Sequence, residues 1–403
     1  MTHQPSCGLY IHIPFCHQRC HFCAFSLEIH QARLVEQFLP ALLREMEHWA
    51  YRMPFAGQPL DSVYFGGGTP TTIASEDLVA ILTAARERFG LRDDAEVTVE
   101  AHPSSVSEES LSRLRTAGVN RISLGAESLE TSELHLVGRP GSRAGTVNAV
   151  AMARKAGFDN INLDLIYGLP RQTLESWSRS LKGIVDLDPS HISCYALTVE
   201  EGTHLHDSIQ RGAVAGPDED HQNEMEDHAE DILARAGFVR YEISNYCRNG
   251  SASRHNLLYW TDGRYLGLGP SAQSYVGARR LGNIYDLSTY LTNLRAGSLP
   301  LSTDEALTVP RMVAERMMFG LRLSEGVRLD DHFTDLPAGL PRRLDELQRR
   351  GLLVHHGALV RLTPLGRRHF DSVAVDLLLS FDETEAAVRS VPLTSEAERV
   401  ETE

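Results

Sequence analysis

Three cysteines near the amino terminus are the residues of this chain best suited to chemistry. Cys16, Cys20 and Cys23 lie within eight residues at the spacing C-x3-C-x2-C. Three such thiolates can hold one [4Fe–4S] cluster, whose irons take four cysteines when all are bound by protein. One iron would stay open to an outside ligand, which predicts a reactive cluster. A structural zinc site and unrelated structural cysteines are the alternatives, but no second Cys or His pair at zinc-ligand spacing stands out.

A glycine run and several acidic residues follow later strand-like segments. The run Gly66-Gly67-Gly68-Thr69-Pro70 would let the backbone approach a ligand closely, although a tight turn uses the same residues. Glu100 ends the third segment, Glu127 follows the fourth, and Asp164 lies with Tyr167 at the end of the fifth. Sites in β/α barrels form where the parallel strands end. We therefore expect these side chains to gather around the cysteine loop.

The elements that must position these residues alternate between strand and helix. Strands are expected at residues 8–13, 62–65, 96–100, 121–124, 161–166 and 191–197, with helices at 34–49, 76–89, 108–116, 144–155 and 174–185. This alternation indicates βαβ units and a parallel sheet. An Ala-Gly pair recurs at 117–118, 156–157 and 236–237, where glycine supplies the left-handed residue that ends a helix. The predicted fold class is α/β, a partial (β/α)6 TIM-like barrel.

The pattern changes after residue 285. A helix rich in Met and Leu is expected at 303–323 and a second at 340–350, followed by strands at 352–355 and 359–362 and a last helix to about residue 379. This order resembles a small winged-helix-like domain, for which packing or substrate gating is expected. The predicted domains are a barrel with its extension at 1–300, a winged-helix-like domain at 301–381, and an acidic tail at 382–403 that is disordered.

Composition limits the classes of partner. The 403 residues include 39 basic and 54 acidic ones, a net charge of −15, which argues against binding to a nucleic-acid backbone. No apolar stretch of about 18 residues occurs, so stable membrane insertion is not expected. No secretory signal stands out, and free cysteines suit a reducing compartment. The predicted location is the cytoplasm, without nucleic acid as a partner.

Charge is unevenly distributed along the chain. Residues 218–231 carry eight acidic residues, which we interpret as a solvated helix face. The stretch from Arg240 to Tyr285 has only two acids among six arginines, which are Arg240, Arg248, Arg254, Arg264, Arg279 and Arg280. This second stretch would suit an anionic ligand.

The cysteine loop and the glycine run together resemble the radical S-adenosylmethionine (SAM) superfamily. The residues Tyr10 to Phe15, the GGGTP run and the stretch from Asp164 to Pro170 resemble its oxygen-independent coproporphyrinogen III oxidase-like family, over about residues 8 to 380. In that family SAM chelates the open iron, and an electron from the cluster breaks a sulfur–carbon bond of SAM. The resemblance therefore implies a [4Fe–4S] cluster, SAM and an electron donor.

The resemblance also assigns roles to single residues. It places Tyr10, Gly67 and Glu100 against the cluster-bound SAM. It places Phe22, Gly68, Thr69, Arg139 and Asp164 at a second SAM, as in the oxidase members. Glu127 stands where the family usually has Gln, so a negative charge enters the second site and argues against a second SAM there.

Two features resemble the HemW-type heme chaperones of this family. Phe25 stands where the oxidases usually have a fourth cysteine, and the chain has the HNxxYW motif as His255-Asn256-Leu257-Leu258-Tyr259-Trp260. Histidine is a common axial ligand of heme iron, the aromatic pair could stack on a porphyrin, and the nearby arginines could pair with propionates. The resemblance implies heme as cofactor, with His255 as its ligand, and apo-hemoproteins as acceptors. From composition alone, a core histidine beside packing aromatics is the alternative.

Three departures leave other functions open. Ala24 stands where these chaperones usually have Asp, Arg139-Pro140-Gly141 where Arg-x-His is common, and Gln273 where His is common. A C-methyltransferase that uses a second SAM, or an oxidoreductase resembling the coproporphyrinogen oxidases, is the enzyme alternative. A redox-inert heme carrier that keeps only the fold is the third possibility.

Overall fold

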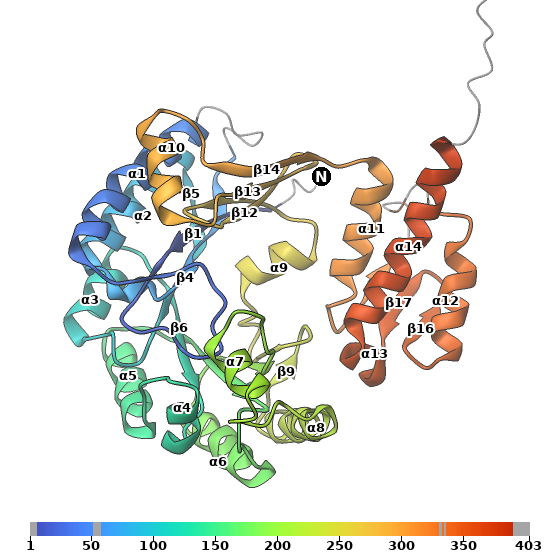
Figure 1. The fold of residues 1–403 in the computed structure, drawn as a ribbon, viewed down its shortest axis with the longest axis horizontal. Helices are drawn as coiled ribbons and strands as arrows, with labels where there is room; N and C mark the ends of the chain where they lie inside the picture. The colour runs from blue at the N-terminus through green and yellow to red at the C-terminus, as the bar shows by residue number, and fades with distance from the viewer. Residues whose placement is uncertain (1–5, 51–57, 330–332, 334–335, 390–403) are drawn as a thin grey trace, which may run out of the picture. The chain divides into compact units, whose positions relative to one another are not determined.

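The computed structural model describes residues 6–50, 58–329, 333 and 336–389. The chain divides into two compact units, Met1–Ala306 and Leu307–Glu403, close to the boundary expected at residue 300. Each unit has its own secondary structure (Figure 1).

Parallel strands form the centre of the first unit. In the main sheet of the described residues seven strands are parallel, in the spatial order β11-β1-β4-β5-β6-β7-β8. Their bounds are β1 Cys7–Ile13, β4 Leu60–Gly67, β5 Leu91–Ala101, β6 Arg121–Glu127, β7 Asn160–Tyr167, β8 His191–Ala196 and β11 Arg264–Leu268. The expected α/β fold with a mostly parallel sheet is confirmed, and β11 is a parallel strand that the pattern did not predict.

Helices α1, α2, α3, α5 and α6 lie along the outside of these strands, whereas α7 and α9 do not (Figure 1). The helix bounds are α1 Ala32–Ala50, α2 Ser75–Phe89, α3 Glu108–Thr116, α4 Thr131–Leu136, α5 Arg143–Lys155, α6 Leu174–Val185, α7 His204–Gln210, α8 Glu219–Arg235, α9 Arg254–Trp260 and α10 Leu287–Arg295, with a short 3₁₀ turn at Pro70–Thr72. The α1 side chains Phe38, Leu42 and Met46 are fully buried. Their spacing of four residues keeps them on one helix face, which packs into the main core.

Successive residues of each parallel strand point to opposite faces. In β1, Leu9 and Ile11 belong to the apolar core, whereas Tyr10 and His12 hydrogen-bond to each other. The same alternation in β5 gives buried Val97 and Val99 around Thr98, followed by Glu100. One face of the sheet therefore packs against helices, and the other supplies polar side chains to a site.

The repeated Ala-Gly joints end helices as the sequence predicted. Gly118, Gly157 and Gly237 have φ angles of 104°, 89° and 82°. After the first of them, the amide of Val119 donates to the carbonyl of Leu114 at 3.0 Å, and the other two joints have the same bond. This pattern closes a helix C-terminus with glycine in the left-handed region.

Antiparallel strands extend the sheet at both edges. β12 Gln273–Val276, β13 Arg279–Asn283 and β14 Leu301–Ala306 follow β11, while β10 Asn245–Cys247 and β9 Val239–Arg240 follow β8. The helix expected at 303–323 is wrong in its first turns, because residues 301–306 pair with β13. The helix α11 begins only at Val309, after Thr308 caps its N-terminus and with Pro310 in its first turn.

The second unit contains the predicted helices and strands in their predicted order, with an additional strand, β15, and a last helical region divided into α13 and α14. It consists of α11 Val309–Gly320, β15 Val327–Arg328, α12 Leu340–Arg349, β16 Leu353–His356, β17 Leu359–Leu362, α13 Pro364–Arg368 and α14 Phe370–Arg389. The last helix was expected to end near residue 379, and a disordered tail was expected from Asp382. Instead α14 continues to Arg389, and residues 390–403 lie outside the described ones. No helix in the described ranges is both long and apolar enough to cross a membrane.

Candidate cofactor site

The cysteine loop begins where β1 ends and is held there by the glycine run. The amide of Gly68 donates to the carbonyl of Ile13 at 2.9 Å, and the amide of Thr69 donates to that of Phe15 at 2.7 Å. A Cβ on Gly68 would lie 2.6 Å from the Phe15 carbonyl oxygen, so only glycine fits. The Thr69 hydroxyl lies 3.4 Å from the Cys16 Sγ. The glycine run therefore positions the first cysteine as well as approaching a ligand.

Arg19 shapes the loop from inside. Its guanidinium donates to the carbonyls of Cys23, Phe25 and Leu27 at 3.4, 3.3 and 2.8 Å. These bonds join the segment between the first and second cysteines to the segment that begins at the third. Small strands β2 Phe15–Cys16 and β3 Glu28–Ile29 close its base. Sequence reasoning missed Arg19, and its place inside a C-x3-C-x2-C loop was the only signal.

A second contact fixes the segment between Cys20 and Cys23. The His21 ring lies against the His204 ring with centroids 4.1 Å apart, and its amide donates to Val137 at 2.8 Å. Next to it, Phe22 packs against an apolar cluster of Val137, Ile166, Leu169, Leu197 and Leu205. The loop is thus held by the α4–α5 connection on one side and by α7 on the other. Phe22, expected at a second SAM, is engaged in this packing.

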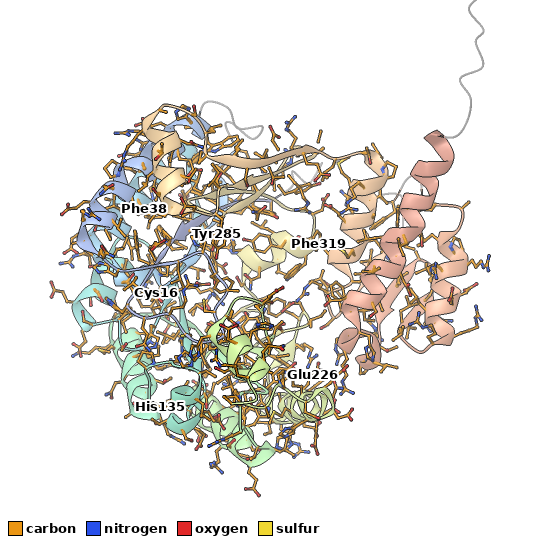
Figure 2. The ribbon with its side chains drawn as sticks, viewed as in Figure 1. Cys16, Phe38, His135, Glu226, Tyr285 and Phe319 are labelled. Atoms are coloured by element: carbon orange, nitrogen blue, oxygen red, sulfur yellow. The ribbon has the colours of Figure 1, made fainter. Side chains whose placement is uncertain are left out.

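The three thiols are free and electrostatically linked. Burial raises the pKa of Cys16, while the Thr69 hydrogen bond lowers it. Burial also raises the pKa of Cys23, and the charges of Arg19 and Arg139 lower it. The charge of Cys20 raises the pKa values of both Cys16 (labelled in Figure 2) and Cys23. Three thiols on one loop with cations beside them have the ligand chemistry of an iron–sulfur cluster, because cations favour the thiolate form that binds iron. In the part of the chain that the structure describes, no three His, Cys, Asp or Glu side chains are already arranged to hold a single metal ion.

Glu100 and Tyr10 lie together beside the glycine run. The Tyr64 hydroxyl donates to the Glu100 Oε1 at 2.7 Å, and the Tyr10 ring stacks on the Tyr64 ring at 6.2 Å between centroids. A Cβ on Gly66 would lie 3.0 Å from the Tyr10 ring and 3.1 Å from the Glu100 Oε2. Burial raises the pKa of Glu100 to about 7, and the Tyr64 hydrogen bond opposes that rise. Near neutral pH this carboxyl is divided between its protonated and ionised forms, and the ionised form can accept a hydrogen bond from an ammonium group such as that of SAM.

Gly67 can be replaced by no other residue without strain, because of both its backbone conformation and its closeness to His12. Its φ is 109°, which non-glycine residues rarely adopt, and a Cβ there would lie 2.6 Å from the His12 ring. The His12 Nε2 lies 2.8 Å from the Ser26 carbonyl oxygen, beyond the third cysteine. Gly67, His12 and the cysteine loop therefore depend on one another sterically.

Asp164 belongs to a hydrogen-bonded set on neighbouring strands. Its carboxylate accepts from the Ser123 hydroxyl at 3.0 Å and from the Asn162 amide at 2.9 Å. The charge of Asp164 raises the pKa values of Glu100 and Glu127, so the three carboxyls share one electrostatic environment. The expected gathering of acidic residues at one rim is thus present in the structure.

Glu127 and Arg139 form an ion pair next to the second cysteine. Their charged atoms are 3.2 Å apart, and both side chains are 13% exposed. The Arg139 Nη1 also lies 3.5 Å from the Cys20 Sγ, and its Nη2 donates to the Gly125 carbonyl at 2.6 Å. Burial raises the pKa of Glu127 to about 7 against the opposing charge of Arg139. Both residues were expected near a second SAM, and here they bind each other.

His255 packs against β4, next to Ser62 and Tyr64, and is 1% exposed. Its Nδ1 lies 2.8 Å from the Ser62 hydroxyl and its Nε2 lies 2.9 Å from the Tyr259 hydroxyl. Its ring stacks on Tyr64 at 5.1 Å between centroids. Burial lowers the pKa of His255 to about 3, with the Arg121 charge acting in the same direction. The imidazole is therefore neutral, and both of its nitrogens have partners.

A buried carboxylate that the sequence reasoning missed holds the HNxxYW helix, α9, in place. Glu96 of β5 accepts from the amides of Arg254 and His255, both at 3.0 Å, and from the Ser253 hydroxyl at 3.3 Å. These contacts satisfy amides at the start of α9 that have no partner within the helix. Glu96 could have been recognised as the polar residue two positions before Thr98 and four before Glu100 on the same strand face.

The six arginines expected to suit an anionic ligand are mostly paired within the protein. Arg240 binds Glu226 of α8 (labelled in Figure 2) at 2.7 Å and Arg248 binds Asp188 at 2.6 Å. Arg254 and Arg279 pair with Asp94 and Asp304. These four arginines therefore already have carboxylate partners, which are distant in the sequence and meet them in the fold. The remaining two are Arg264 and Arg280, the latter lying over the Tyr275 ring.

A parallel barrel with a three-cysteine loop at its rim is the architecture of a radical SAM protein. Residues 10–182 match the family model of the Radical SAM superfamily, and residues 307–369 match that of the HemN C-terminal domain. The solved structure of coproporphyrinogen III oxidase (HemN) from Escherichia coli, a radical SAM enzyme, is similar with a TM-score of 0.82 and 25% identity. It covers 94% of this chain and 91% of that chain.

Curated relatives narrow the family. The heme chaperone HemW of Mycobacterium tuberculosis is 37% identical over 378 residues, which cover 92% of this chain and 94% of that protein. HemW of Bacillus subtilis is 34% identical, covering 89% and 95%. Mitochondrial radical S-adenosyl methionine domain-containing protein 1 of Bos taurus is 32% identical, covering 93% and 88%. The chain therefore belongs to the HemW family, and its superfamily implies a [4Fe–4S] cluster and SAM.

Proposed function

We propose that this protein is a heme chaperone of the HemW type that binds a [4Fe–4S] cluster, SAM and heme and delivers heme to apo-hemoproteins in the cytoplasm. One observation carries the proposal. His255 of the HNxxYW motif stacks on Tyr64, and Tyr64 donates to Glu100, the carboxylate beside the glycine run. The motif that the family resemblance links to heme is thus connected through Tyr64 to Glu100, and the His255 ring lies 6.4 Å from the ring of Tyr10, another residue that the resemblance links to SAM.

Cys16, Cys20 and Cys23 would hold the cluster, with Tyr10, Gly67 and Glu100 against the SAM that completes it. When bound, the cluster supplies an open iron for the methionine end of SAM and an electron for its cleavage. The contribution of the chain would be to hold three thiolates on one loop and to place the Glu100 carboxyl beside the glycine run that supports this loop. An electron donor is the partner that this chemistry requires.

The same geometry supports one SAM per chain. Arg139 contacts Cys20, Glu127 and the Gly125 carbonyl, so the guanidinium expected to bind a second SAM is already engaged. Gly68 and Thr69 are engaged with the cysteine loop. A second SAM would have to displace the Glu127 carboxylate from Arg139.

His255 is the proposed heme ligand, and its contacts define what ligation requires. A neutral imidazole is the form that binds heme iron, and its low pKa keeps it neutral. Either ring nitrogen must give up a hydroxyl partner, Ser62 or Tyr259, to reach iron. Heme binding would therefore rearrange α9, whose residues Tyr259 and Trp260 are only partly buried.

A heme titration of the anaerobically purified protein tests this proposal. His255→Ala should weaken heme binding at least tenfold, measured from the Soret absorbance. His135→Ala, which changes an exposed histidine on α4, is the matched control and should bind heme as the wild type does. Equal heme affinity in the wild type and the His255 variant would exclude His255 as the ligand.

A radical SAM enzyme of the HemN-like class is the second candidate, because the cysteine loop, Tyr10 and Glu100 are all in place. Reduced, cluster-loaded protein would then form 5′-deoxyadenosine, and a C-methyltransferase would form S-adenosylhomocysteine as well. If neither product forms over hours while heme is bound, the protein acts as a carrier.

A further inference from the structure

Arg139 links one cysteine of the cluster loop to a buried carboxylate. Its Nη1 lies 3.5 Å from the Cys20 Sγ, and its Nη2 lies 3.2 Å from the Glu127 Oε1. Each side chain is 13% exposed, so water screens this pair much less than a surface pair. The charge of Glu127 is therefore felt at Cys20 through a single guanidinium.

The fold makes room for the pair at some conformational cost. Glu127 has a φ of 60°, in the left-handed region that non-glycine residues rarely occupy, at the point where the register of β6 and β7 shifts. Gly125 has no side chain, and a Cβ there would lie 2.6 Å from the Arg139 Nη2 and 2.9 Å from the Glu127 Oε1. A residue held in such a conformation points to a functional reason for the contact.

Charge and hydrogen bonds at the cluster thiolates determine how readily a cluster accepts an electron. A guanidinium at Cys20 stabilises the reduced cluster, which carries one more negative charge. A carboxylate paired with that guanidinium opposes the effect. We propose that Arg139 and Glu127 act as a pair that sets the reduction potential of the cluster, Arg139 raising it through Cys20 and Glu127 lowering it through Arg139. The proposal rests on the cluster of the proposed function and adds residues that tune it.

A purely structural role for the pair predicts something different. If Arg139 and Glu127 only joined the α4–α5 connection to β6, then removing either one would change cluster loading or protein stability and leave the potential of the loaded cluster alone. The sign of the potential change therefore distinguishes tuning from tethering. The other carboxyl that acts on both residues is Asp164, which stays in place in every variant below.

The test is a redox titration of the reconstituted full-length protein without SAM, followed by the electron paramagnetic resonance of the reduced cluster. Glu127→Gln keeps the shape of the side chain and leaves Arg139 unbalanced. The midpoint potential should rise by at least a tenfold change in the one-electron equilibrium, about 59 mV. Arg139→Gln should lower it, and the double variant should lie between the two. Glu130→Gln, which breaks the exposed ion pair of Glu130 with Arg179, controls for the change in net charge and should match the wild type.

The proposal is overturned if Glu127→Gln has the potential of the Glu130→Gln control, or if it shifts downward. If Arg139→Gln loads no cluster, Arg139→Lys replaces it, because lysine keeps the positive charge. The potential of Arg139→Lys should differ from that of the wild type by less than the potential of Glu127→Gln does. A larger shift in Arg139→Lys than in Glu127→Gln would also overturn the proposal. Iron and sulfide analysis of the wild type separates the two hypotheses. A wild type that loads no cluster contradicts the proposed function itself, whereas a loaded cluster with unchanged potentials contradicts only the tuning role.

Discussion

His255 and Tyr64 stack with ring centroids 5.1 Å apart and an angle of 27° between their planes. Tyr64 in turn donates to Glu100, so the HNxxYW helix and the expected SAM site share one aromatic contact. Tyr10 joins the same aromatic group, with its ring 6.4 Å from the His255 ring and 6.2 Å from the Tyr64 ring. The two binding functions proposed for this protein are therefore expected to influence each other.

Tyr64→Phe tests this connection at the SAM end. The substitution removes the hydroxyl that lowers the pKa of Glu100, so this pKa should rise above about 7 and leave less carboxylate at neutral pH. SAM affinity at pH 7 should fall a few-fold and recover at pH 8.5, as measured by equilibrium dialysis of cluster-loaded protein. Affinity that does not change with pH in the variant would show that Glu100 does not bind SAM as a carboxylate.

Tyr259→Phe tests the heme end. The Tyr259 hydroxyl occupies the Nε2 of His255, and a net hydrogen bond contributes about 1 kcal/mol. Freeing that nitrogen should raise heme affinity about fivefold if iron binds there. Tyr265→Phe, which removes a hydroxyl that accepts from Arg280 on a ring packed against Tyr259, is the control. Heme affinity that falls in Tyr259→Phe alone would instead make Tyr259 a direct contact of the heme.

Glu127→Gln should change how many SAM molecules bind. The wild type is expected to bind one SAM per chain because Glu127 occupies Arg139. The neutral amide holds the guanidinium more weakly, and saturation binding should approach two SAM per chain. Glu108→Gln, which disrupts an exposed pair with Lys155, should keep the stoichiometry of one. Two SAM molecules on the wild type would contradict the blocking role of Glu127.

Glu45 should make stability depend on pH. This carboxyl is fully buried in α1, where it accepts from Tyr290, Asn283 and the Gly269 amide, and burial raises its pKa to about 7. Between pH 4.5 and 7 the folded state holds a proton that the unfolded state has released. Stability from this group therefore falls as the pH rises through that window, by up to about 3 kcal/mol.

Glu45→Gln should flatten this part of the pH profile, as measured by urea unfolding at pH 5 and pH 8. The variant loses an acceptor and should be less stable than the wild type at both values, with the smaller deficit at pH 8. Equal slopes in the two proteins would mean that Glu45 titrates in the folded state as it does in the unfolded one.

The alternation of strands and helices predicted most of the barrel because each parallel strand carries a short apolar run between amphipathic helices. The same strands also alternate polar and apolar residues, as in Tyr10-Ile11-His12-Ile13 and Asn162-Leu163-Asp164-Leu165. That period of two marks the face that lines the site. It could have identified Ser123 and Asn162 from the sequence, which single-residue motifs did not.

Ion pairs and hydrogen bonds between residues far apart in the chain could not be predicted from the sequence. The arginines from 240 to 280 looked available because few acids are near them in the chain. In the fold, Arg254 meets Asp94 and Arg248 meets Asp188 across 160 and 60 positions. The same limit applies to His255, whose partner Ser62 is 193 residues away. Motif spacing is the basis for the prediction of which residues carry chemistry, and tertiary structure shows which of those residues already have partners within the protein.

Heme transfer tests the central proposal most directly. Cluster-loaded protein is charged with heme, separated from free heme and mixed with an apo-cytochrome, and the spectrum of the acceptor is followed over time. The account predicts that the wild type and His135→Ala convert the acceptor to its heme-bound form, whereas His255→Ala takes up little heme and transfers correspondingly little. Heme that stays on the wild-type protein, or an acceptor that fills no faster with it than with free heme alone, would contradict the chaperone function.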